Sequence, residues 1–155
     1  MKVKHILLTQ GLKAIVDKGF FEELNQYNWY AQNGGSTFYA CRTRYKIYMH
    51  REILRLAGIE LGPHTDHIDG NGLNNVLSNL RPATVAQNIR NRKKSVNNTS
   101  GFKGVSFCRV TNKWCAYIHF CRKKYHLGLF NTPEEAASAY GKAATRFHRE
   151  FSRPY

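Results

Sequence analysis

The sequence predicts an α+β protein in two parts, and three observations support this fold class. Runs with a period of two indicate strands in residues 1–49 and again from residue 101 onward. Between them lies a segment rich in turn-forming Asp, Asn and Gly residues that ends in a helical pattern. The 155 residues are enough for one ordinary domain or two small ones. We therefore expect a β-rich N-terminal part and a C-terminal three-stranded antiparallel sheet packed on one helix.

The N-terminal part is expected to contain strands and two helices. Alternation predicts the strands at residues 4–9, 14–17 and 38–44. A short helix is expected at 20–27 and a second at 47–57, where apolar residues recur at helical spacing. The second helix would carry His50 close to the polar segment that follows. His50 is thus a candidate for the catalytic centre, although a lone His at a helix start is often only a hydrogen-bonded structural residue.

The most informative segment is Asp66-His67-Ile68-Asp69-Gly70-Asn71, which is followed by Asn75 and Asn88. A carboxylate and an amide oxygen can share a hard divalent cation, while an adjacent imidazole takes a proton from water. This combination is typical of metal-assisted phosphodiester hydrolysis. Asp-Gly and Asn-Gly pairs are also ordinary turn formers, so the surrounding residues have to decide between the two interpretations.

These residues resemble the HNH endonucleases of phages and introns. Asp66-His67 matches the first element of the motif, Asn75 the middle Asn, and Asn88 the third element, where Asn often replaces His. Further similar residues flank the segment, namely Met49-His50-Arg51, Asn79-Leu80-Arg81 and Gln87-Asn88-Ile89-Arg90-Asn91.

The resemblance implies a ββα-metal core, also called a His-Me finger. Its first strand is expected within residues 62–69, and its second near residues 80–84. Its helix should begin at about Val85, with Thr84 as the N-cap. Asn88 would then lie in the first turn of that helix.

Chemistry and the resemblance together assign roles to these residues. His67 is expected to be the general base, because a neutral imidazole can accept the proton of the attacking water near pH 7. Asp66 and Asn88 are expected to ligate one divalent metal, Mg²⁺, with Mn²⁺ able to replace it.

Asn75 is expected to tie the loop together and to orient His67 through a backbone carbonyl. Asn71 and Asn74 are alternatives for this role. Plain turn chemistry is an equally good explanation for all three asparagines.

The charge of the chain points to a polyanionic partner. The sequence has 24 Lys and Arg against 10 Asp and Glu, a formal net charge of +14. It shows no long apolar run, signal-peptide pattern or lipidation signal, so we expect no membrane association. No obligatory protein partner is evident, and double-stranded DNA is the expected partner.

The four cysteines form no CxxC pair, which argues against structural zinc. We expect them to be reduced thiols in the cytoplasm of a bacterial or phage-infected cell.

A basic linker is expected at residues 91–100, between a nuclease domain with its β-rich leader at 1–90 and a DNA-binding domain at 101–155. Four of the five residues 90–94 are positively charged, and small polar residues follow. Such a stretch can stay solvated or lie along phosphates. The candidate phosphate contacts in it are Arg90, Arg92, Lys93 and Lys94.

The C-terminal part is expected to have strands at 104–109, 113–120 and 123–130. A helix should follow, because Thr132 is an N-cap, Pro133 suits the first helical position, and Glu135 completes a capping box. An alanine-rich face would let this helix lie flat on the sheet.

This part resembles the apetala/ethylene-response-factor DNA-binding domain over nearly its full length. The matching residues are Gly101-Phe102-Lys103-Gly104-Val105, Lys113-Trp114, Ala116, Ile118, Leu127-Gly128-Leu129-Phe130, Thr132-Pro133-Glu134-Glu135-Ala136-Ala137 and Ala139-Tyr140. The resemblance implies that the exposed sheet face enters the major groove and reads bases.

The match is partial, so the recognised DNA sequence does not carry over. Four positions that carry Arg, Glu, Arg and Trp in plant members are here Ser106, Tyr117, His119 and His126. The remaining candidates for DNA contact are Lys103, Arg109, Trp114, Arg122 and Lys124. Trp114 can equally be a core residue.

The sequence as a whole predicts a site-directed DNA endonuclease of the homing type. A one-metal HNH centre would cut, and the C-terminal domain would position it. Two alternatives remain open: a DNA-binding regulator whose HNH segment is not catalytic, and an RNA-binding module.

Overall fold

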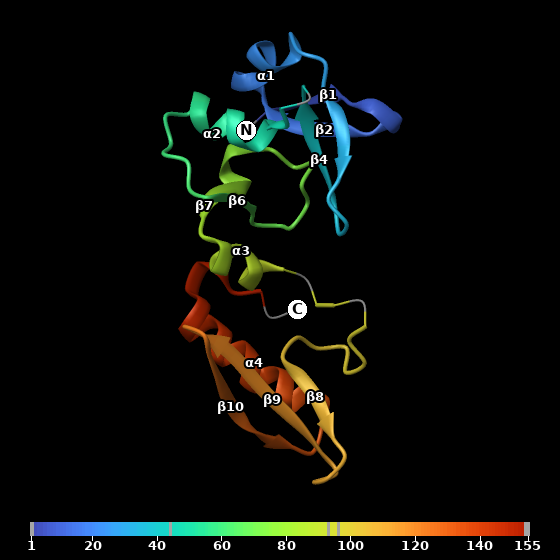
Figure 1. Cartoon of the computed structure of the whole chain (residues 1–155), viewed down its shortest axis with the longest axis vertical. Helices are drawn as coiled ribbons and strands as arrows, with labels where there is room; N and C mark the ends of the chain where they lie inside the picture. Colours follow the sequence, from blue (N-terminus) through green and yellow to red (C-terminus); the bar gives the residue numbers. More distant parts are fainter. Residues whose placement is uncertain (1, 44, 93, 96, 154–155) are drawn as a thin grey trace. The chain divides into compact units, whose positions relative to one another are not determined.

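The computed structural model describes residues 2–43, 45–92, 94–95 and 97–153. The protein is a mixed α+β chain, and the described residues contain several small antiparallel sheets and four α-helices (Figure 1). They form two compact units, residues 1–88 and residues 89–155. The predicted mixed α+β class is therefore confirmed. No helix in the described part of the chain is both long and apolar enough to cross a membrane.

The first half of unit 1 consists of small sheets and two short helices. Its elements are β1 (Val3–Leu7), β2 (Lys13–Asp17), α1 (Lys18–Asn25), β3 (Tyr30–Asn33), β4 (Phe38–Arg42), β5 (Ile47–Tyr48) and α2 (Met49–Leu56). β1 pairs with β2, and β4 lies between β3 and β5 in a second sheet. The helix predicted at 47–57 begins two residues late, because residues 47–48 pair with β4 as a short strand.

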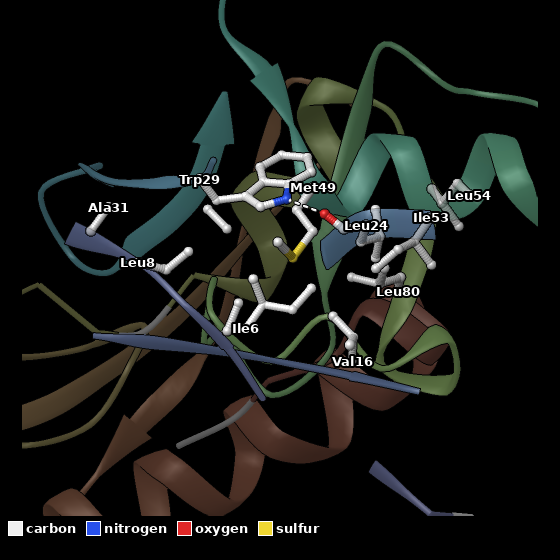
Figure 2. Close-up of a cluster of buried hydrophobic side chains, with 12 residues drawn as sticks. Ile6, Leu8, Val16, Leu24, Trp29, Ala31, Met49, Ile53, Leu54 and Leu80 are labelled. Carbon is white, nitrogen blue, oxygen red and sulfur yellow. Dashed lines mark hydrogen bonds between the residues drawn. The ribbon is translucent and has the colours of Figure 1, made fainter. Parts of the chain in front are cut away.

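The core of unit 1 packs against the buried side of α2 (Figure 2). This packing also fixes the position of His50, which lies in the same helix. Met49, Ile53 and Leu54 of α2 are fully buried, as their helical spacing predicted. Burying such a side chain stabilises the fold by about 1.5–3 kcal/mol relative to leaving it exposed. The Trp29 Nε1 donates a hydrogen bond of 2.8 Å to the carbonyl of Leu24. These contacts hold α2 with His50 turned inward at its first turn.

A hairpin completes unit 1 and leads into the third helix. β6 (His64–His67) pairs antiparallel with β7 (Leu80–Ala83), which places Asp66 opposite Arg81. The loop between them is held on β2, because Ile15 N donates to the Leu73 carbonyl and Asn75 N donates to the Ile15 carbonyl, both at 2.8 Å.

The third helix, α3 (Val85–Asn91), follows the hairpin directly. Thr84 Oγ1 accepts from Gln87 N at 3.3 Å, and Gln87 Oε1 accepts from Thr84 N at 2.7 Å. The predicted N-cap at Thr84 is therefore confirmed, and it takes the form of a capping box. The boundary between the two units falls within this helix, between residues 88 and 89.

Unit 2 is a three-stranded antiparallel sheet packed on one helix, as predicted. Its elements are β8 (Val105–Cys108), β9 (Lys113–Phe120), β10 (Lys123–Phe130) and α4 (Pro133–His148), with β9 in the centre of the sheet. Thr132 caps α4 in a full capping box.

Small residues let α4 of unit 2 approach the sheet closely. Ala136 packs with Val105 and Ala116, and Ala144 packs with Ile118 and Tyr140. Gly104 has a φ of +70°, and a Cβ there would lie 2.3 Å from the Tyr140 ring. A larger residue at position 104 would therefore push the helix off the sheet.

Candidate functional site

The hairpin β6–β7 brings an acidic and a basic side chain together inside unit 1. Asp66 is 3% exposed. The Nε and Nη2 of Arg81 donate to its Oδ2 at 2.8 and 2.7 Å. The pairing follows from the strand register, because directly opposed residues of antiparallel strands project to the same face. The predicted metal ligand Asp66 thus lies in a buried ion pair, which was not expected from the sequence.

His67 follows Asp66 in β6 and points into a buried contact with the loop. Its Nε2 lies 3.2 Å from Oδ1 of Asn75, and both side chains are buried. An amide oxygen only accepts hydrogen bonds, so Nε2 carries the proton and the basic lone pair is on Nδ1. Asn75 therefore contacts His67 directly through its side chain, and not through a backbone carbonyl as expected from the sequence.

An aromatic cluster surrounds His67. The ring centroids of His50 and His67 are 5.0 Å apart with an interplanar angle of 87°. Tyr39 lies 5.7 Å from His50 and 5.8 Å from His67, and Tyr48 stacks on His50 at 5.3 Å. The Nδ1 of His50 is buried and has no hydrogen-bond partner in the described part of the chain. The structure thus places all four rings in one cluster, with His50 packed against the candidate base.

Burial in this cluster keeps both histidines neutral. It is the main reason that the pKa of His50 is lowered to about 3, and electrostatic interactions with His67 and Arg51 lower it further. Burial also lowers the pKa of His67, although the hydrogen bond to Asn75 and the charges of Asp69 and Asp66 act in the opposite direction. A neutral imidazole at position 67 can accept a proton at neutral pH.

A second carboxylate, that of Asp69, organises the loop between β6 and β7. Its oxygens accept hydrogen bonds from Asn71 N, Asn74 Nδ2 and Asn79 Nδ2 at 2.7–3.0 Å. Burial raises the pKa of Asp69, but these hydrogen bonds outweigh it and hold the pKa below its ordinary value. Asn71 and Asn74, the alternatives to Asn75, thus bind this carboxylate.

Asn79 ties the two ends of this loop together. Its Oδ1 accepts from Asp69 N at 3.0 Å, and its Nδ2 also donates to the Asn74 carbonyl at 2.8 Å. In the sequence, Asn79 is recognisable only as a neighbour of the motif. Its place directly before β7 was the available signal that it closes the loop.

Asn88 lies half-buried in the first turn of α3, with its backbone N donating to the Thr84 carbonyl at 3.0 Å. Its expected partner in metal binding, Asp66, lies in the hairpin that leads into this helix. Within the described residues, no three or more His, Cys, Asp or Glu side chains are grouped to hold a metal ion. Any metal here would have to use few protein ligands of the oxygen type, which is a donor set that suits Mg²⁺.

Two of the candidate DNA contacts, Lys94 and Lys103, donate hydrogen bonds to backbone carbonyls within unit 2. Lys103 Nζ donates to the carbonyls of Arg90 and Arg92, and Lys94 Nζ donates to the carbonyl of Gly101 at 2.7 Å. Burial is the main reason that the pKa of Lys103 is lowered to about 8. Lys103 therefore binds the C-terminal end of α3. Lys93 lies outside the described residues.

The sheet of unit 2 has one face packed on α4 and one face turned away from it. Tyr117 and His119 alternate with the buried residues of β9, and the register places His126 and Lys124 beside them. Lys124 Nζ lies 4.0 Å from the centroid of the Tyr117 ring. This face, made of Tyr117, His119, Lys124 and His126, is called the outer face below.

The other C-terminal candidates lie elsewhere. Trp114 packs with Phe107 at 5.1 Å and belongs to the cluster beneath α4, so the core role that the sequence left open is the one that the structure supports. Arg109 is exposed just after β8, and Arg122 is exposed in the turn between β9 and β10 with a φ of +62°.

Comparison with known proteins finds relatives among viral proteins. Protein 3.8 of Escherichia phage T7 is 35% identical over 95 residues, which cover 61% of this chain and 78% of that protein. An uncharacterized HNH endonuclease of Acanthamoeba polyphaga mimivirus is 31% identical over 148 residues, which cover 94% of this chain and 75% of that protein.

Plant transcription factors are similar over a shorter stretch. An AP2-like ethylene-responsive transcription factor of Arabidopsis thaliana is 38% identical over 58 residues, 37% of this chain and 12% of that protein. APETALA2-like protein 2 of Oryza sativa subsp. japonica is 40% identical over 63 residues, 41% of this chain and 14% of that protein. No model of a known protein family matches the sequence. No solved structure is significantly similar to the chain.

Proposed function

The chain belongs to the HNH endonuclease family, and from this premise we propose that it hydrolyses phosphodiester bonds of double-stranded DNA with His67 as general base. The observation that carries the proposal is the buried contact between His67 and Asn75, which leaves the lone pair of the imidazole on Nδ1, while burial of His67 lowers its pKa. A base that is fixed by one ring nitrogen and accepts a proton at the other suits the deprotonation of water.

Each residue of the cluster has a distinct part in this proposal. His67 takes the proton of the attacking water at Nδ1, which typically contributes ~10²–10⁴-fold to the rate. Asn75 orients the ring through its Oδ1, and His50 and Tyr39 hold it by packing. His50 is thus proposed as a positioning residue, because its lowered pKa and burial keep it uncharged behind the base.

Asp66 and Asn88 would hold a divalent metal, Mg²⁺ or Mn²⁺, through their side-chain oxygens. Such an ion offsets the negative charge that builds up on the phosphate during hydrolysis. Two oxygen ligands from the protein leave room for water and phosphate oxygens, as Mg²⁺ prefers. The donor set therefore fits the proposed ion, although Arg81 already occupies the Oδ2 of Asp66.

The proposed site-directed, homing type of activity rests on unit 2. The similarity to plant transcription factors supports DNA binding by this unit. The exposed Arg109 and Arg122 and the Lys124 of the outer face are the proposed DNA contacts there, and Arg90, Arg92 and Lys94 are proposed to contribute positive charge along the phosphates.

A plasmid-nicking assay with Mg²⁺ tests the proposal. His67→Ala should abolish nicking while it leaves duplex affinity nearly unchanged, because the base acts on water. His64→Ala is the matched control, since His64 is an exposed residue of the same strand and should keep full activity. Nicking by His67→Ala within tenfold of the wild type would refute the base assignment. Duplex binding without any cleavage by the wild type would favour the DNA-binding regulator.

The metal assignment needs its own variants. Asn88→Ala should shift the Mg²⁺ dependence of nicking to higher concentration, whereas Asn88→Asp, which keeps an oxygen ligand, should restore it. The same Mg²⁺ dependence in Asn88→Ala and the wild type would show that Asn88 is not a ligand.

A further inference from the structure

The ion pair between Arg81 and Asp66 is placed where the proposed metal would bind. Two nitrogen atoms of Arg81 donate to one oxygen of Asp66 at 2.7–2.8 Å, and the two side chains are 15% and 4% exposed. A pair this buried is only weakly screened by salt. A cation approaching Asp66 in the free protein therefore meets a carboxylate whose charge is already neutralised.

The rest of the site adds little negative charge. Asn88, the other proposed ligand, has an uncharged amide side chain. Asp69 is engaged by three asparagines in the loop. No group of three or more acidic, His or Cys side chains in the described ranges could hold a metal by itself. Mg²⁺ sites with so few carboxylates usually take the missing oxygens from a substrate phosphate.

We propose that Arg81 makes metal uptake depend on DNA. In the free protein, Arg81 neutralises Asp66 and the site binds a divalent cation weakly. A DNA phosphate at the site brings both oxygen ligands and negative charge, so the cation binds tightly only in the DNA complex. This inference rests on the proposed function, and Arg81 acts in it through Asp66 as a positioning residue.

The alternative is that Arg81 only joins the two strands of the hairpin. In that case its removal would change the stability of unit 1 and leave the metal affinity of the folded protein as it was. The affinity for a metal in the absence of DNA distinguishes these two roles, and it requires no turnover.

The experiment measures Mn²⁺ binding to the full chain by the loss of the electron paramagnetic resonance signal of free Mn²⁺. It compares the protein alone with its complex with a mixed-sequence duplex, in the His67→Ala background so that the duplex stays uncut. We expect affinity at least tenfold weaker without the duplex. Binding to the duplex alone is subtracted, because DNA phosphates attract Mn²⁺ by themselves.

Arg81→Gln then tests the neutralising role. Removing a positive charge next to the ligand should strengthen Mn²⁺ binding to the free protein by about tenfold, even at a high effective dielectric constant. Arg42→Gln is the matched control, because Arg42 pairs with Glu52 in the same unit and its side chain is 13% exposed. This control should bind Mn²⁺ like the parent protein.

The outcomes separate the inference from the proposed function. Equal Mn²⁺ affinity with and without duplex would overturn the inference, and this comparison needs no variant at position 81. A folded Arg81→Gln with the affinity of the parent would overturn it as well. Unchanged specific Mn²⁺ binding in the complex with Asp66→Asn would instead refute Asp66 as a ligand, and with it the metal part of the proposed function.

Discussion

Acid should destabilise unit 1 through His50. The pKa of His50 is lowered from 6.5 to about 3 because the side chain is buried. In the unfolded chain the imidazole takes up a proton as the pH falls below 6.5, but in the folded protein it stays neutral until about pH 3. The unfolded state therefore binds more protons in this window, and the free energy of unfolding falls as the pH falls.

The size of this effect follows from one proton. Each proton that is taken up on unfolding changes the free energy of unfolding by about 1.4 kcal/mol per pH unit. Between the ordinary His value and pH 5, His50 should therefore cost unit 1 about 2 kcal/mol. The lowered pKa of His67 adds to the loss in the same direction.

Urea denaturation at pH 7 and pH 5 measures this loss. The two tryptophans lie one in each unit, so the fluorescence of Trp29 in a Trp114→Phe background reports on unit 1 alone. His50→Phe should remove the share of the pH dependence that comes from His50, because it keeps an aromatic ring in the cluster and lacks the titrating nitrogen. His64→Ala, an exposed change in β6, should leave the pH dependence intact. The reasoning is refuted if His50→Phe and the wild type lose the same free energy between the two pH values.

Three further outcomes are expected. Because burial lowers the pKa of His67, the single-turnover rate of cleavage should begin to fall only below the ordinary value of 6.5, and a midpoint above it would contradict the assignment. Asn79→Ala should destabilise unit 1 by about 1–3 kcal/mol in denaturation, because it removes three hydrogen bonds that join Asn79 to Asp69 and to the Asn74 carbonyl. Lys103→Met should lower the stability of unit 2 without changing the salt dependence of duplex binding. Arg122→Gln should instead reduce the slope of the logarithm of the binding constant against the logarithm of the salt concentration by about one. An equal change of this slope in both variants would show that Lys103 also contacts a DNA phosphate.

The parts of the fold with local signals could be predicted from sequence. The strands expected at 113–120 and 123–130 are β9 and β10, because sustained alternation and a tight turn define them without help from distant residues. The caps at Thr84 and Thr132 were equally local. Residues 47–48 were misassigned to a helix because their strand partner, β4, lies several residues earlier in the chain.

The candidate site could be predicted only in part, because its supporting contacts join residues that are distant in sequence. Tyr39 reaches His67 from β4, and nothing in its own neighbourhood marks it. Arg81 could have been found by pairing the two strands of the hairpin in register with Asp66. Lys103 was predicted to contact DNA because it is positively charged. Its hydrogen bonds to the carbonyls of Arg90 and Arg92 could not be predicted, because these residues lie more than ten positions away in the sequence.

The place of the unit boundary inside α3 matters for anyone who wishes to exchange the DNA-binding unit between relatives. The basic stretch 91–100 is the obvious place for a joint, but a cut there separates Lys103 from the carbonyls of Arg90 and Arg92. The recipient's backbone would then have to supply these two carbonyls, and a recipient whose helix ends differently would leave a partly buried ammonium group without an acceptor, at a cost of about 1–3 kcal/mol or more. A joint ahead of Val85 transfers the whole of α3 together with the two carbonyls that bind Lys103. It also brings in residue 88 from the protein that contributes unit 2. Such chimeras would therefore inherit unit 2 together with the residue that is proposed to ligate the metal.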